Sequence, residues 1–122
     1  GYVYNFNPRL YVHGFHSVSV PTDSREAMLI SNDVGVGYWL YRNPTDNIVQ
    51  AIIPTVEVHV NTPLTNRPPG DPNINQTVLV DSITITSGVN FLLPRSTFGA
   101  AVGVPVIGVV GIEATATWTM RF

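Results

Sequence analysis

The chain has 122 residues, enough for one domain with a modest hydrophobic core, and we expect a single domain over residues 1–122. Only 11% of the residues are charged and 44% are hydrophobic, whereas about a quarter of a typical soluble domain is charged. We therefore expect much of the surface to face something other than water, or to be covered in a larger assembly. A net charge of -2, with no lysine, provides no basic stripe for nucleic acid.

The absence of cysteine excludes disulfides and thiolate metal sites, and it is compatible with export from the cytoplasm. The first residues lack the basic and apolar regions of a signal peptide, so we expect a mature chain or an excised segment. No run approaches the roughly 20 apolar residues of a membrane helix. If the protein meets a bilayer, strands make the contact.

Alternation of apolar and polar residues with a period of two recurs along the chain and predicts strands. Two noisier segments come first, over 10–20 and 34–41, with aromatic residues on both faces. The clearer alternations follow at 56–61, 82–91, 98–106 and 112–122. In the last of these, the apolar face carries Ile112, Ala114, Ala116, Trp118, Met120 and Phe122, and the polar face carries Glu113, Thr115, Thr117, Thr119 and Arg121.

Turn-forming residues separate these segments, at 21–24, 43–47 and 108–111. The stretch 62–75 contains four prolines and is predicted to be a long loop, because proline cannot donate to a strand ladder. We therefore expect an all-β fold, an antiparallel meander of about six strands joined as hairpins.

Two architectures share this periodicity. In a soluble sandwich or jelly roll the apolar faces meet in a core, whereas in a membrane barrel they meet lipid and the polar faces line the lumen. The polar faces here carry mostly Thr, Ser, Asn and Gly, and one strand could exceed ten residues. Both features favour a β-barrel, or a segment of one, because membrane strands need roughly 9 to 11 residues.

The final strand, 114–122, ends in an aromatic residue and resembles the closing strand of bacterial outer-membrane barrels. The stretches 20–25, 32–42 and 56–64 are similar to the C-terminal half of outer-membrane proteins predicted in planctomycete bacteria. This resemblance implies a location and an architecture rather than a substrate. It implies an outer-membrane location, with the lipid bilayer as partner.

About six strands are fewer than the eight of the smallest single-chain barrels. Either the chain is the C-terminal part of a larger barrel, or several copies pool their strands, or no barrel forms. We expect a non-enzymatic barrel acting as a passive pore or structural element, with the 62–75 loop on the outside and no cofactor. The alternative is a secreted or cell-surface module used for binding or assembly.

The chemical groups do not form a recognisable catalytic set. His13 and His16 are three residues apart, so on a strand they point to opposite faces and we expect no metal site. The carboxylates Asp23 and Glu26, with Arg25 between them, are interpreted as a solvated loop. No serine lies in a G-x-S-x-G sequence. We therefore expect no enzyme activity.

Two further sequence patterns have structural interpretations. The segment 35–37 lacks the last glycine of a dinucleotide fingerprint, and we expect it to allow a bend or an aromatic neighbour to pack over it. The segment 75–77 matches a glycosylation sequon, which a bacterial context would leave unused.

The barrel hypothesis assigns specific side chains to its two surfaces. The candidates for the lumen are Glu57, His59, Asn61, Glu113 and Arg121. The candidates for interfacial aromatic belts are Tyr38, Trp39, Tyr41, Trp118 and Phe122. In the sandwich alternative the first group keeps a face wet and the second packs in a core.

Overall fold

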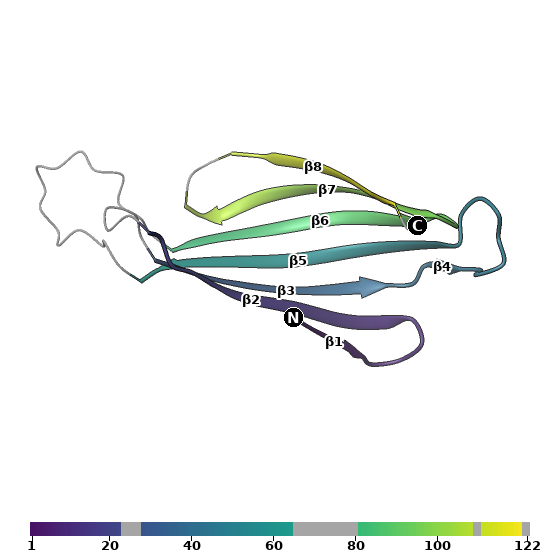
Figure 1. Cartoon of the computed structure of the whole chain (residues 1–122), viewed down its shortest axis with the longest axis horizontal. Helices are drawn as coiled ribbons and strands as arrows, with labels where there is room; N and C mark the ends of the chain where they lie inside the picture. Colours follow the sequence, from purple (N-terminus) through teal and green to yellow (C-terminus); the bar gives the residue numbers. More distant parts are fainter. Residues whose placement is uncertain (23–27, 65–80, 109–110, 121–122) are drawn as a thin grey trace, which may run out of the picture.

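The computed structural model describes residues 1–22, 28–64, 81–108 and 111–120, and they form one antiparallel sheet of eight strands. The strands are β1 (Tyr2–Asn5), β2 (Leu10–Ser19), β3 (Leu29–Tyr38), β4 (Tyr41–Arg42), β5 (Ala51–Pro63), β6 (Ser82–Leu92), β7 (Ser96–Ile107) and β8 (Glu113–Met120). Their order is β1-β2-β3-β5-β6-β7-β8, with β4 beside β5, so neighbours in sequence lie side by side (Figure 1). The predicted antiparallel meander is confirmed.

The six predicted strands correspond to the six long strands β2, β3, β5, β6, β7 and β8. The sequence did not indicate β1 and β4, which have four and two residues and are too short to show a period. The predicted turn at 43–47 is present, with the Asn43 side-chain oxygen accepting from the Thr45 amide at 3.3 Å. The predicted loop from Thr62 begins later, because β5 continues to Pro63, and its remaining residues from 65 onward lie outside the described ranges.

Strand β3 begins at Leu29, five residues before the predicted start. The sequence did not indicate these residues as strand, because Ser, Asn and Asp in the first half of β3 are typical of turns. Each of these residues has a polar partner on an adjacent strand. Ser31 donates to Asn61 at 2.6 Å, Asn32 lies 2.8 Å from the His16 ring, and Asp33 lies 2.8 Å from the His59 ring. Cross-strand hydrogen bonds thus override the local preference of Ser, Asn and Asp for turns.

Strand β5 also begins earlier than predicted, at Ala51. The prediction started later because Pro54 interrupts the alternation of apolar and polar residues. Pro54 is paired with Val89 of β6. On its other side it lies between Thr55, the last partner of β3, and Ile52, a partner of β4. Proline is tolerated here because the ladder on that side is already broken between β3 and β4.

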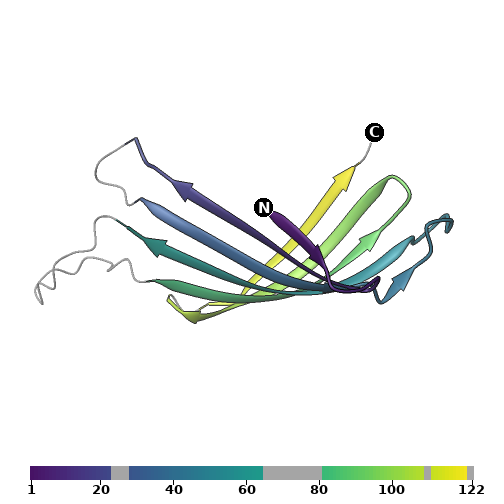
Figure 2. The ribbon, with the colours of Figure 1, turned by 90° about the horizontal axis from the view of Figure 1, so that it is seen from below.

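The sheet is strongly curved and open (Figure 2). In the described part of the chain, β8 contacts no strand except β7, and β1 contacts none except β2. The strands therefore do not close into a barrel. The described residues also contain no helix long and apolar enough to cross a membrane.

The two faces of the sheet differ in chemistry and in exposure. In β5 the odd-numbered residues face the concave side, where Ala51, Ile53 and Thr55 are buried, whereas Val56 and Val58 on the convex side are exposed. The described core is small: Ala51 and Ile53 are its buried apolar residues, and Thr55 beside them is 7% exposed. The convex side has large apolar residues such as Val102 and Val104, which are 48% and 49% exposed.

Candidate functional site

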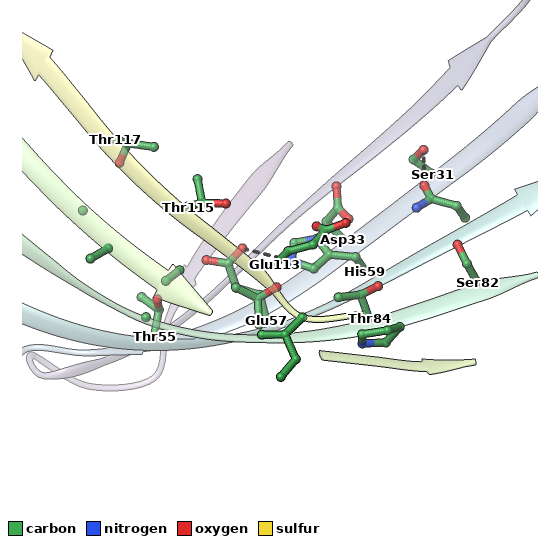
Figure 3. A pocket seen from close by; sticks show the side chains of 18 of the residues that line it. Ser31, Asp33, Thr55, Glu57, His59, Ser82, Thr84, Glu113, Thr115 and Thr117 are labelled. Carbon is green, nitrogen blue, oxygen red and sulfur yellow. Dashed lines mark hydrogen bonds and ion pairs between the residues drawn. The ribbon is translucent and has the colours of Figure 1, made fainter. Parts of the chain in front are cut away.

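The concave face forms a cavity of ≈ 910 Å³ that reaches from β2 to β8. Small hydroxyl and amide side chains line much of it, as Figure 3 shows for one region. Its polar lining residues are Ser17, Ser31, Asp33, Thr55, Glu57, His59, Asn61, Ser82, Thr84, Thr86, Asn90, Glu113, Thr115 and Thr117. This polar surface follows from the alternation of the strands, because side chains two residues apart share a face.

The strand register places most of the ionisable side chains of this face in two neighbouring rows across the sheet. The first row, called the Glu57 row, consists of His13, Gly35, Glu57, Thr86, Gly103 and Glu113. The second, called the His59 row, consists of Phe15, Asp33, His59, Thr84 and Pro105. Glu57 is the middle residue of β5, whereas Glu113, at the far end of its row, is the first residue of β8.

Glu57 lies between two histidines. Its Oε1 is 3.8 Å from Nε2 of His13, and its Oε2 is 3.8 Å from Nε2 of His59. Gly35 makes the first approach possible, because a Cβ at this position would lie 2.6 Å from both Glu57 Cγ and His13 Nε2. The side chains of His13 and Glu57 therefore approach each other across Gly35, which has no side chain to separate them.

Asp33 holds the other side of the His59 ring, with Oδ1 2.8 Å from Nδ1. All four side chains of this group are about 30% exposed (29–32%), so they are accessible from the cavity without being fully solvated. Carboxylates on both sides of an imidazole orient the ring and fix its position. The group presents negative charge to the cavity through Asp33 and Glu57.

An aromatic ring covers the glycine of the next row. Tyr11 of β2 packs over Gly37 of β3, and a Cβ on Gly37 would collide with the Tyr11 ring. This is the arrangement that the segment 35–37 led us to expect. The ring replaces the packing surface that glycine lacks.

Of the five side chains assigned to the lumen, Glu57, His59, Asn61 and Glu113 all lie on the concave face. Arg121 lies outside the described residues. His13 and His16 lie on opposite faces, since His13 is opposite Gly35 on the concave side and His16 is paired with Asn32 on the convex side.

Asp33 and His13 were not predicted to lie on this face. Asp33 follows Ser31 and Asn32, which are typical of turns, so the sequence did not indicate that it lies in a strand. The alternation of Val12, Val18 and Val20 indicates that His13 faces away from them, so the sequence contained a signal for this residue.

The aromatic candidates divide between the two sides of the sheet. Tyr38, Tyr41 and Trp118 have the phase of the convex face, since they are paired with Leu10, Ile52 and Phe98. Trp39 instead packs with its ring centroid 6.2 Å from that of Tyr11, and the Arg42 guanidinium lies 4.7 Å from its centre. Phe122 lies outside the described residues.

The described residues contain no group of three or more His, Cys, Asp or Glu side chains placed to hold a metal ion. The segment that contains Asp23, Arg25 and Glu26, and the sequon at 75–77, are outside the described ranges. Comparison of the sequence with protein-family models and with curated proteins, and of the fold with solved structures, finds no match.

Proposed function

We propose that this chain forms wall strands of an outer-membrane β-barrel that acts as a passive pore or structural element and carries out no covalent chemistry. The observation that supports this function most directly is the direction of curvature. Figure 2 shows the curvature of the sheet, and polar side chains line much of the concave cavity (Figure 3). The convex face carries exposed valines, and the small apolar core of Ala51 and Ile53 lies at one end of the concave face.

A sheet that wraps around a protein core places its apolar residues on the concave side. Here the convex residues Val34, Val56 and Val58 are 43%, 51% and 38% exposed, whereas concave Thr55 is nearly buried. Membrane barrels have this distribution, because lipid surrounds the outside and water fills the lumen.

The apolar band has a height that suits a bilayer. On the convex side of β5 it runs from Ile52 to Val60, eight residue steps that correspond to about 27 Å along the strand. At the usual strand tilt of about 40° this gives about 20 Å across the membrane, close to the ~25 Å apolar band of outer-membrane barrels.

Aromatic residues gather at one end of this band. Phe91, Phe98 and Trp118 lie side by side in register on β6, β7 and β8, and Tyr41 is beside Ile52 in the same row. Rings at the edge of an apolar band are typical of the boundary between hydrocarbon and headgroups.

Behaviour in the presence and absence of detergent tests the proposal. We expect the purified chain to aggregate in detergent-free buffer and to form a β-rich species in micelles. Size-exclusion chromatography with light scattering and circular dichroism measure both outcomes, and the protein mass in the micelle gives the number of copies that share a barrel. A monodisperse, folded, β-rich species without detergent would exclude the lipid-facing assignment. It would favour the sandwich or jelly-roll module, in which protein covers the convex valines.

A further inference from the structure

The fixed charges in the Glu57 row and the His59 row of the concave face are all negative. The carboxylates there are Glu57 and Glu113 in the Glu57 row and Asp33 in the adjacent His59 row. The ionisable side chains that share these two rows with them are His13 and His59. No arginine occurs in either row of the described sheet, and the chain has no lysine.

The described arginines lie toward one end of the sheet. Arg9 precedes β2, Arg42 is opposite Ala51 at the start of β5, and Arg95 lies in the connection between β6 and β7. Arg42 is six residues along the sheet from the Glu57 row, about 20 Å at the rise of a strand. Arg9 is four residues from His13 of the same row, about 13 Å.

These separations decide whether the arginines cancel the carboxylates. Charges in contact with a solution of about 0.15 M salt are screened beyond roughly 8 Å. Both backbone separations exceed that length, so screening weakens the effect of Arg9 and Arg42 on an ion at the Glu57 row. The end of the sheet that carries the arginines and the two rows that carry the carboxylates therefore act as separate electrostatic regions.

The two rows also place the carboxylates across the sheet instead of along one strand. Glu57 and Glu113 come from β5 and β8 and are separated in their row by Thr86 and Gly103. Neither of these intervening residues is charged. When tilted strands surround a lumen, such a row rises around the wall, so Glu57 and Glu113 lie at different depths of the same lining. Asp and Glu side chains that line a pore favour cations.

We propose that the Glu57 row and Asp33 form a charge filter that favours passage of small cations over anions. The proposal rests on the pore function above and specifies which solutes it favours. It requires no bound ion, because the preference arises from the potential of fixed carboxylates in a confined aqueous space.

The test is the zero-current potential of the full chain reconstituted in planar bilayers under a KCl gradient. We expect the wild-type protein to pass K⁺ in preference to Cl⁻ and the double variant Glu57→Gln/Glu113→Gln to lower the permeability ratio severalfold. Asp33→Asn should lower it further. Raising the salt on both sides to about 1 M should weaken the wild-type preference, because screening then acts within roughly 3 Å.

The matched control is Asp46→Asn, which removes one carboxylate from the exposed connection between β4 and β5. It should leave the permeability ratio unchanged, and circular dichroism in micelles should show the same β content for all variants. A conducting protein whose zero-current potential favours Cl⁻, or does not respond to the double substitution, would overturn the filter and leave the pore intact. Absence of conductance would overturn the pore and the filter together.

Discussion

At the scale of single residues, Asp46 organises the connection between β4 and β5. One carboxylate oxygen accepts from the amides of Ile48 at 2.8 Å and Val49 at 3.2 Å, and the other accepts from the Tyr41 hydroxyl at 3.0 Å. These hydrogen bonds lower the pKa of Asp46 below its ordinary value of 3.8, because each favours the charged carboxylate. The hydrogen bond from the Ile48 amide has the largest effect, followed by those from the Tyr41 hydroxyl and the Val49 amide.

The sign of this shift predicts how the connection responds to acid. Because the folded-state pKa of Asp46 is lowered, its hydrogen bonds stabilise the folded connection above about pH 4 and lose that contribution as pH falls through the lowered pKa. An NMR titration of the carboxyl group should give a midpoint below 3.8, and Tyr41→Phe should raise it. Tyr38→Phe is the matched control and should leave it unchanged. A wild-type midpoint at or above 3.8 would contradict this account.

At the scale of elements, β5 is the central strand of the sheet, and its two faces carry different side chains. Val58 is on its convex face, paired with Val34 and Ile85, and the adjacent His59 is on the concave face. Neighbouring residues on this strand therefore face opposite sides of the sheet.

This contrast predicts the effect of a charge on each face. If lipid covers the convex face, Val58→Arg should lower the free energy of unfolding by about 2–4 kcal/mol, as expected for an arginine at the bilayer midplane. Thr115→Arg, on the concave face of β8, should change it by less than about 1 kcal/mol, because that position is exposed and wet. Denaturant titration in lipid vesicles measures both values. Equal, small effects of the two substitutions would indicate that water contacts both faces.

The sequence allowed prediction of the elements with a clear period and failed where cross-strand contacts decide the structure. Strand β8 has a uniform alternation, and its two faces are as predicted. The start of β3 depends on hydrogen-bond partners far away in the sequence, 30 residues from Ser31 and 26 residues from Asp33. Local conformational preference does not reveal such partners. The Glu57 row depends on the register of six strands, which no single segment specifies.

At the scale of the whole molecule, the described sheet is one layer where stable domains have two or more. Its buried apolar residues, Ala51 and Ile53 among those described, are too few to offset the entropy of ordering so many strands. Covering the exposed valines of the convex face would supply further stabilisation. For the proposed barrel the covering is lipid, and the resulting loss of contact with water would supply the hydrophobic contribution that the isolated sheet lacks.

The two tryptophans can report which surface meets lipid. Trp118 is on the convex face near the end of β8 and is 70% exposed, whereas Trp39 packs against Tyr11 and lies under the Arg42 guanidinium. In vesicles, Trp39→Phe leaves Trp118 as the reporter and Trp118→Phe leaves Trp39.

We expect quenchers attached near the headgroups of the lipids to reduce Trp118 fluorescence more than Trp39 fluorescence. A quencher deep in the hydrocarbon should be less effective on Trp118 than the shallow one, because interfacial rings lie at headgroup depth. Quenching of Trp118 by aqueous iodide alone, with no effect of labelled lipid, would show that the convex face at this end of the sheet is in water.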